Sequence, residues 1–219
     1  MGLSHLNITG LIPTEIGRLT GISKLMIEGA HIASIPTEIG LLDSLTDLLM
    51  ANNTIERIPS ELGQLTALRV LDLRNNNASG TLPHELFLLD QCRQLRISRN
   101  QLTGTLPTYI GNMTSLWSLE VEHNQLSGPI PSEIGHLSTN RFYVELRLNH
   151  NNFGGSIPSE IGLVRRLDKL YIQGTNLRGP VPTPVCELVN LRYAQFYADC
   201  GQVDCPCCSH CFCSTGGSC

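Results

Sequence analysis

The chain has 219 residues, of which 41% are hydrophobic and 16% are charged, and its formal net charge is −4. A chain of this length buries roughly 70% of the surface that it exposes when unfolded, so a folded protein is expected. The acidic balance lacks the basic field that collects phosphates, and nucleic-acid binding is not expected. The apolar runs fall short of the ~20 residues that a membrane helix needs, so no membrane span is expected in this segment.

A proline that follows Ile, Leu or Val recurs along the chain every 23 or 24 residues, with a single interval of 27. A fixed period of this size is typical of a solenoid, in which each repeat buries its apolar face by stacking on its neighbours. The prolines are Pro13, Pro36, Pro59, Pro83, Pro107, Pro131, Pro158 and Pro182. We predict about eight repeats over residues 1–199, the first of them partial, followed by a separate segment over residues 200–219.

The repeat is clearest at residues 116–137, LWSLEVEHNQLSGPIPSEIGHL. Alternation within a short strand places Leu119 and Val121 inward and Glu120 and Glu122 outward. Asn124 follows at the turn, where its amide is able to bond backbone groups that the bend leaves unpaired. In stacked repeats such amides would form a ladder, in which Thr175 can substitute with its hydroxyl and Ala30 cannot. The predicted ladder is Asn53, Asn76, Asn100, Asn124 and Asn151.

The unit resembles the plant-type leucine-rich repeat, whose G-x-I-P-x-x-I-G segment is carried by residues 10–17, 104–111, 128–135 and 155–162. The resemblance covers residues 3 to about 200. It implies an α/β-type solenoid with a curved parallel sheet on the concave face and irregular or 3-10 helical segments on the convex face.

The sequence departs from this pattern in three places. The repeats at 22–67 lack the Gly before I-P and are one residue shorter. Three extra residues lie between Leu137 and Tyr143, where we expect a bulge or loop. No paired-cysteine cap precedes Leu3, and a solenoid needs capped ends. We therefore expect that a cap was removed or that a further stretch of the protein supplies one.

Eight cysteines fall within the last 34 residues and begin where the repeats end. Disulfides among them would fasten a cap over the last strand edge, which is otherwise an open template for pairing. The eight are Cys186, Cys200, Cys205, Cys207, Cys208, Cys211, Cys213 and Cys219. Cys92 occupies a core position of its repeat and is expected to be a buried free thiol.

Two alternatives for the cysteines remain open. A zinc site would use the thiolates with His210, although the ligand pairs in CPCCSHCFC overlap, and redox chemistry is the other alternative. The tail also resembles one on leucine-rich-repeat proteins of diatoms and related algae, because YADC is followed by CPCCSHC. That resemblance favours the disulfide-rich cap.

Four glycosylation motifs agree with an oxidising compartment and a secreted or cell-surface location. Their acceptors are Asn7, Asn52, Asn77 and Asn112. Asn112 lies in a convex link and is the best acceptor, whereas a glycan on Asn52 would obstruct the exposed face of the sheet.

The outward strand positions define the predicted concave face. Asp72, Arg96, Glu120 and Arg147 alternate in sign along one column, which is typical of exposed salt bridges of little energetic value. The alternative is a mixed-charge stripe, flanked by aromatic residues, that recognises a partner. In the last repeat, Gln195 is predicted beside Tyr171. The candidate binding residues are Asp72, Arg74, Arg96, Arg99, Trp117, Glu120, Glu122, His123, Arg147, His150, Tyr171, Tyr193 and Tyr197.

Catalysis has little support in the sequence. Glu120, Glu122 and His123 resemble an acid–base cluster, but an open solenoid face provides no closed pocket that would shift a pKa. A metal shared by His123, His150 and Glu122 is a lesser alternative. We predict no enzyme activity, no cofactor and no metal site.

The function predicted from these features is an extracellular binding domain that recognises a protein, a peptide or a cell-wall glycan through its concave sheet. One alternative is a structural component of a surface or extracellular assembly. The family resemblance adds an inhibitor of a polysaccharide-degrading enzyme. Ice binding, known for one plant protein of this repeat type, would need a flat array of Thr or Asn, and the charged, irregular columns do not favour it.

Overall fold

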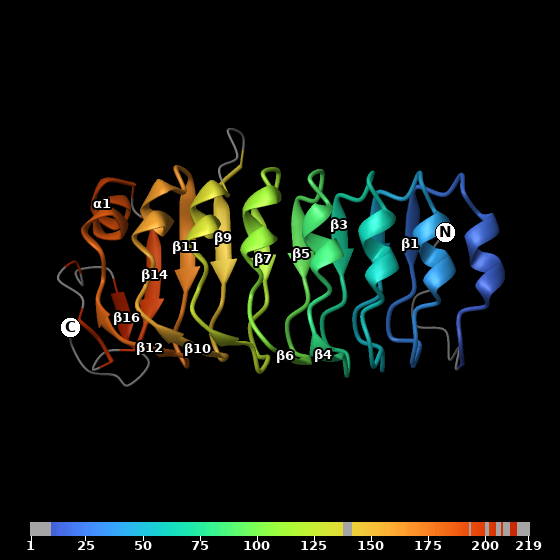
Figure 1. The fold of residues 1–219 in the computed structure, drawn as a ribbon, viewed down its shortest axis with the longest axis horizontal. Coiled ribbons are helices and arrows are strands. Elements are labelled where there is room, and N and C mark those ends of the chain that lie inside the picture. Colours follow the sequence, from blue (N-terminus) through green and yellow to red (C-terminus); the bar gives the residue numbers. More distant parts are fainter. Residues whose placement is uncertain are drawn as a thin grey trace.

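The chain forms a curved solenoid whose repeats stack side by side from the N-terminal to the C-terminal end (Figure 1). The computed structural model describes residues 10–137, 142–192, 194–199, 202–204, 207 and 211–213. Each repeat contributes one short strand to a parallel sheet, and the sheet has nine strands in the order of the repeats. Its strands are β1 (Lys24–Met26), β2 (Asp47–Leu49), β3 (Val70–Asp72), β5 (Gln94–Arg96), β7 (Ser118–Glu120), β9 (Val144–Arg147), β11 (Leu167–Tyr171), β14 (Gln195–Ala198) and β16 (Cys211–Cys213).

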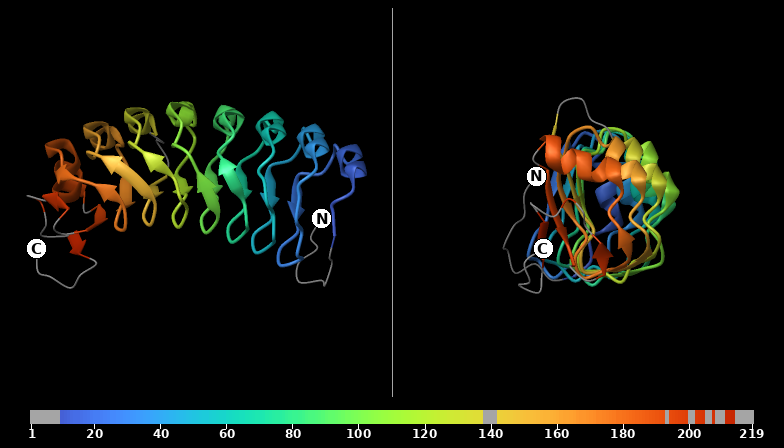
Figure 2. Two further views of the ribbon diagram at one scale, coloured as in Figure 1. Left: turned by 60° about the horizontal axis from the view of Figure 1, so that its bottom comes forward. Right: turned by 90° about the vertical axis from the view of Figure 1, so that its left-hand side faces the viewer.

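A five-residue 3-10 turn follows each I-P or L-P segment in the first seven repeats, because the proline fixes the extended conformation that precedes the turn. These turns lie along the outer side of the arc, with the sheet inside it (Figure 2). The predicted concave and convex faces are confirmed. The turns are η1 (Thr14–Arg18), η2 (Thr37–Leu41), η3 (Ser60–Gln64), η4 (His84–Leu88), η5 (Thr108–Asn112), η6 (Ser132–His136) and η7 (Ser159–Leu163), and helix α1 (Thr183–Arg192) takes their place in the next repeat.

The Gly that ends the I-G segment allows neighbouring turns to pack closely. A Cβ atom on Gly63 would lie 2.5 Å from the carbonyl oxygen of Glu85 in the next turn, which is too short for any side chain. In η4 this position is occupied by Phe87, whose side chain is fully buried. The contact between η4 and η5 is accordingly less extensive than that between the other adjacent 3-10 turns.

Short lateral strands join the repeats along a second side of the solenoid. Gly80, Gly104, Gly128, Gly155 and Gly179 all have positive φ angles and lie in or beside these strands. The shorter repeats at 22–67 lack this Gly and form no such strand among their described residues. The lateral strands are β4 (Ser79–Thr81), β6 (Gln101–Thr103), β8 (Ser127–Gly128), β10 (Asn152–Gly155), β12 (Asn176–Leu177), β13 (Gly179–Pro180) and β15 (Val203–Asp204).

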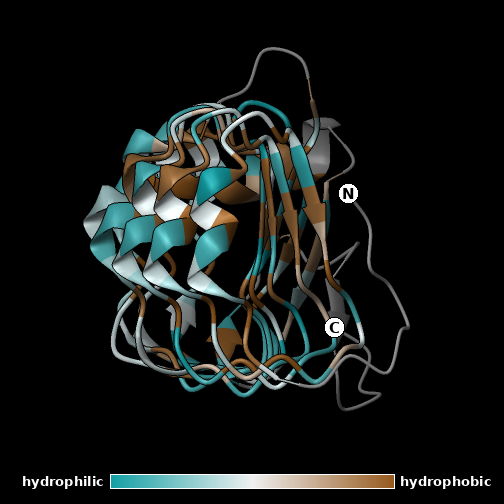
Figure 3. Ribbon diagram, turned by 90° about the vertical axis from the view of Figure 1, so that its right-hand side faces the viewer, coloured by the Kyte–Doolittle hydropathy of each residue, from teal (hydrophilic) through white to brown (hydrophobic). Residues whose placement is uncertain are grey.

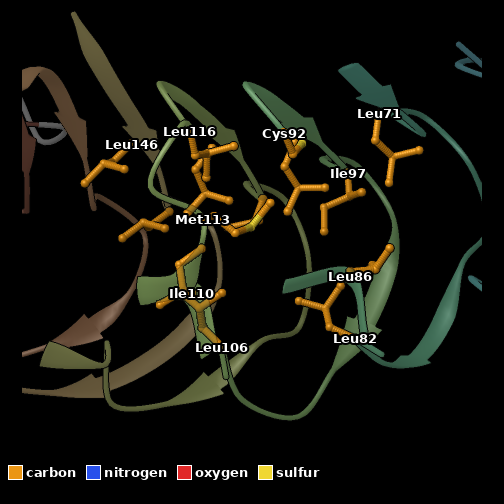
Figure 4. Packing of buried hydrophobic residues seen from close by; sticks show 14 of the residues in the cluster. Leu71, Leu82, Leu86, Cys92, Ile97, Leu106, Ile110, Met113, Leu116 and Leu146 are labelled. Atoms are coloured by element: carbon orange, nitrogen blue, oxygen red, sulfur yellow. The ribbon is translucent and has the colours of Figure 1, made fainter. Parts of the chain in front are cut away.

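The hydrophobic core is continuous and lies between the sheet and the turns. Viewed from the N-terminal end of the stack, hydrophobic stretches of ribbon line the space between these layers (Figure 3). Figure 4 shows Cys92 and Ile97 pointing into this space together with Ile110 and Met113 from the convex side. Cys92 is a buried free thiol, as predicted, and burial raises its pKa to about 12. It therefore stays protonated and packs as a small apolar side chain.

The predicted asparagine ladder is confirmed. The Asn124 Nδ2 group donates to the carbonyl oxygens of Val121, in its own repeat, and Ile97, in the preceding repeat, both at 3.0 Å. Its Oδ1 atom accepts a hydrogen bond from the Leu102 amide at 3.0 Å. The same three kinds of bond recur at Asn53, Asn76, Asn100 and Asn151.

Thr175 substitutes in part, because its hydroxyl donates to the carbonyl of Ile172 within the same repeat at 2.7 Å. Ala30 has no side-chain group to offer. Its backbone N–H is instead bound by the Oδ1 atom of Asn53 from the following repeat, at 3.0 Å. The ladder therefore connects one repeat to the next as well as closing each turn.

The C-terminal segment covers the last repeat. A disulfide joins Cys186 in α1 to Cys207, β16 pairs with β14, and β15 pairs with β13. This confirms a staple between the last repeat and the tail, as predicted. Cys200, Cys205, Cys208 and Cys219 lie outside the described residues, as do Asn7, His210 and the inserted residues 138–141. The division into a solenoid at 1–199 and a cap at 200–219 stays a prediction.

The register of the last repeat corrects one prediction. Tyr197 pairs with Tyr171, and Gln195 pairs with Lys169, so Gln195 is not beside Tyr171. The cause is α1, which is ten residues long, whereas each 3-10 turn has five. The longer helix shifts the strand that follows it by two residues relative to the repeat period.

Replacement of Asn124 by Ala tests the ladder. The change removes three hydrogen bonds and leaves buried backbone groups unpaired, so we expect the free energy of unfolding to fall by about 3 kcal/mol. Asn77→Ala is the control, because Asn77 is exposed, and we expect a change of less than about 0.5 kcal/mol. Urea unfolding followed by circular dichroism measures both, and equal effects of the two substitutions would contradict the role given to Asn124.

Candidate functional site

The concave face carries a cluster of buried charged residues at its centre. Asp72, on β3, is 2% exposed and Glu120, on β7, is 6% exposed. Arg96, on β5 between them, reaches both carboxylates, with its Nη1 atom 3.7 Å from Asp72 Oδ2 and its Nε atom 3.1 Å from Glu120 Oε1. The predicted contacts between Asp72, Arg96 and Glu120 are thus present. Their predicted exposure is wrong, because these carboxylates are buried.

Arg74 explains much of that burial. It donates from Nη2 and Nε to Asp72 at 2.6 and 2.9 Å, and its Nη1 atom lies 3.4 Å from Glu120 Oε2. The hydrogen bond with Asp72 raises the pKa of Arg74. Because Arg74 spans two carboxylates, removing any single charge from this cluster would leave another one buried without full compensation, a change that is typically costly.

Arg147 departs from the predicted series of salt bridges between neighbouring strands. Its guanidinium binds Glu145 within the same strand, with Nη2 and Nε at 2.7 and 2.8 Å from Glu145 Oε1. The nearest carboxylate in the neighbouring repeat is Glu122, whose Oε1 atom is 4.0 Å from Arg147 Nη1. The prediction that Arg147 continues the ladder from Glu120 is therefore wrong. Glu145 was not predicted as a site residue, because the outward strand position two residues before Arg147 was not considered.

Stacked rings continue the surface towards the C-terminal end. The rings of Tyr171 and Tyr197 are 4.4 Å apart with an interplanar angle of 14°, and the Arg147 guanidinium carbon lies 5.5 Å from the centroid of Tyr171. Burial and the neighbouring Tyr197 raise the pKa of Tyr171 to about 12. Tyr171 therefore stays uncharged at neutral pH, and both of its faces are occupied.

A second stack lies where the strands end. The rings of His123 and His150 are 4.3 Å apart with an interplanar angle of 15°. Both residues have left-handed backbone conformations, with φ angles of 56° and 52°. Burial, His150 and Arg99 together lower the pKa of His123, so the neutral ring is favoured. No cluster of three or more potential metal ligands occurs in the part of the chain that the structure describes.

Between these stacks and Arg147 the concave face has a polar hollow of about 220 Å³. Its walls come from four successive repeats. The lining includes predicted site residues together with Asn149 and Gln173, which were not among the candidate binding residues. The lining residues are Arg99, Glu122, His123, Arg147, Asn149, Tyr171 and Gln173.

Trp117 lies apart from this hollow. Its ring is 5.8 Å from that of Phe142, beside the inserted segment, and Tyr143 is 69% exposed next to it in sequence. Phe142 and Tyr143 were not predicted as site residues, although their aromatic character within an insertion was a usable signal. Tyr193 lies outside the described residues.

These features define a parallel-strand repeat solenoid with a charged and aromatic concave face. The family comparison agrees with this class. A model described as "Leucine-rich repeat region" matches residues 48–142, and one described as "Leucine Rich Repeat" matches residues 144–163, together more than half of the chain. The chain belongs to the leucine-rich repeat family. A search of curated proteins finds no significant match.

Solved structures of plant receptors are similar over nearly the whole chain. The plant peptide hormone receptor RGFR1, in complex with RGF2, is 30% identical with a TM-score of 0.84, over 94% of this chain and 32% of the receptor chain. The ectodomain of GASSHO1/SCHENGEN3 from Arabidopsis thaliana, in complex with CASPARIAN STRIP INTEGRITY FACTOR 2, is 30% identical with a TM-score of 0.77, over 90% and 25%. The chain thus spans about a third or less of these receptor chains.

A plant ice-binding protein is also similar, at 26% identity and a TM-score of 0.55, over 80% of this chain and 71% of that protein. No helix in the described part of the chain is both long and apolar enough to cross a membrane.

The pH dependence of stability tests the environment of Glu122. Burial raises the pKa of Glu122 above its usual value, so keeping this carboxylate charged costs more free energy in the folded chain than in the unfolded chain. The charged Glu122 carboxylate therefore lowers the free energy of unfolding. This loss of stability is absent below the pKa of Glu122 in the unfolded chain and is fully present above its pKa in the folded chain. We expect Glu122→Gln to raise the urea midpoint at pH 7 relative to the wild type, and this difference to shrink as the pH falls towards 4. A difference that grows at low pH would contradict the buried, uncompensated carboxylate.

Proposed function

We propose that this chain is a ligand-binding segment of an extracellular leucine-rich-repeat protein and that it holds a polypeptide along its concave sheet from β3 to β14. The observation that carries the proposal is the unbroken series of charged and aromatic side chains from Asp72 to Tyr197, which are held by ion pairs and ring stacking before any partner binds. Groups held in this way are preorganised, so binding loses less side-chain entropy.

The similar receptors support a polypeptide ligand, because those proteins were solved with RGF2 and CASPARIAN STRIP INTEGRITY FACTOR 2 bound. The disulfide between Cys186 and Cys207 supports an oxidising, extracellular location. The exposure of Asn52, Asn77 and Asn112 leaves three glycosylation motifs accessible. The same features support a binding module rather than an enzyme, because the charged side chains at the centre of the face are already paired with one another.

A glycan ligand has less support on this face. Sugar rings are commonly held by apolar packing on an aromatic face, and both faces of Tyr171 are already covered by Arg147 and Tyr197. Ice binding also has less support, despite the similarity to a plant ice-binding protein, because the middle column from Asp72 to Arg147 is charged and alternates in sign. An inhibitor or an assembly component would bind protein as well and remains within the proposal.

Selection from a displayed library of random peptides tests this proposal. We expect the wild-type chain to enrich peptides, and the double variant Tyr171→Ala/Tyr197→Ala to bind them at least about 30-fold more weakly, as expected for truncating an aromatic pair that anchors a ligand. The matched control is Tyr109→Ala, which removes a half-exposed tyrosine from the convex turn η5 and should leave affinity unchanged.

Two results would count against the proposal. Peptides that bind the double variant as tightly as the wild type would place the binding surface elsewhere. Failure to enrich any peptide, together with binding on a glycan array that the double variant loses, would replace the polypeptide ligand with a carbohydrate.

A further inference from the structure

Two acceptor atoms in the polar hollow are buried and lack a hydrogen-bond donor among the described residues: Glu122 Oε2 and Gln173 Oε1. Glu122 is 9% exposed, so its side chain is about nine-tenths removed from solvent. Buried acceptors in folded proteins are normally paired, and an unpaired one is a sign of a missing partner. Because Glu122 and Gln173 both line the same hollow, a single group bound there would face both side chains.

The positive charges nearby do not meet this need. Arg147 is held by Glu145, and its closest approach to Glu122 is 4.0 Å, too long for a hydrogen bond. Arg99 lines the hollow and has no ion pair with any described residue. His123 is biased towards its neutral form by burial and by the adjacent His150 and Arg99, which lower its pKa.

The negative charges around the site are otherwise matched. Glu145 is bound by Arg147, with Lys169 Nζ at 3.9 Å, and Glu120 is contacted by Arg74 and Arg96. Glu122, the carboxylate in the lining of the hollow, is therefore compensated less than Glu145 or Glu120: its partners within the chain are Arg147 at 4.0 Å and hydrogen bonds with the Ser98 side chain and with its own backbone. Burial of such a group is tolerated when a partner supplies the opposite charge.

We propose that the hollow binds a cationic nitrogen group, an ammonium or a guanidinium, carried by a side chain or the N terminus of a peptide ligand. Such a group supplies N–H donors to both Glu122 Oε2 and Gln173 Oε1 and compensates the carboxylate charge, which a neutral donor does not. An anionic group would face two unpaired acceptors. The inference names the ligand chemistry for one part of the proposed peptide-binding face and rests on that proposed function.

Small probes test the site without any peptide. The wild-type chain, labelled with ¹³C at the glutamate carboxyl carbons, is titrated at pH 7 with butylammonium, with methylguanidinium and with neutral butyramide. We expect a saturable shift of the Glu122 carboxyl signal with one or both cations, with an apparent Kd on the order of millimolar for ligands this small. Which cation binds more tightly distinguishes a lysine or terminal amine from an arginine as the source.

Two variants make the test specific. Glu122→Gln keeps the size of the side chain, and the loss of one carboxyl signal in this variant assigns the signal of Glu122. We expect the variant to bind the cations about tenfold or more weakly. The ring signals of His123 report this binding, because the variant has no Glu122 carboxyl signal. Glu28→Gln is the matched control, because Glu28 occupies the equivalent outward column in the first complete repeat, away from the hollow, and should leave binding unchanged. Thermal unfolding confirms that each variant is folded.

Equal affinity for butyramide, an unchanged affinity in Glu122→Gln, or the absence of any saturable shift would each overturn the inference. These outcomes are separate from failure of the proposed function. If the cations bind and no peptide is enriched, the cation site holds and peptide binding fails. If peptides bind through the two tyrosines and the cations do not, peptide binding holds and the cation site fails.

Discussion

The hydrogen bonds of the asparagine ladder are the constraint on which the rest of the structure depends. Each asparagine amide joins a carbonyl of its own repeat to one in the preceding repeat, so the strands of these repeats are held in register with their neighbours. The hydrophobic effect that drives stacking has no direction and cannot set this register by itself. The directional bonds align the outward columns and thereby bring Asp72, Arg96 and Glu120 into contact.

Fixed columns allow the concave face to bury charge before a partner arrives. Arg74 and Arg96 compensate Asp72 and Glu120 from within the sheet, whereas the nearest guanidinium to Glu122 is that of Arg147, at 4.0 Å. Buried ion pairs contribute little net stability, so folding alone does not account for their arrangement, which is consistent with the recognition that we propose.

Much of the fold is predictable from the sequence, because the repeat period, the strand alternation and the ladder positions are local patterns copied along the chain. The bonds of Asn124 and the buried position of Cys92 follow from those patterns. The sequence alone does not predict which of several nearby side chains each charged or aromatic residue contacts. Arg147 binds Glu145 in its own strand, and Arg74 binds Asp72. The length of α1 places Tyr197 beside Tyr171.

Hydrogen exchange of the backbone amides that donate to the ladder tests the central claim most directly. These are the amides of Ile55, Ala78, Leu102 and Leu126, which bind the Oδ1 atoms of Asn76, Asn100, Asn124 and Asn151. If the ladder holds the repeats in register, these amides should exchange as slowly as those of the central strands and open only with the unfolding of neighbouring repeats. Exchange at the rate of exposed turn amides would show that register is set by core packing instead, and would contradict the account.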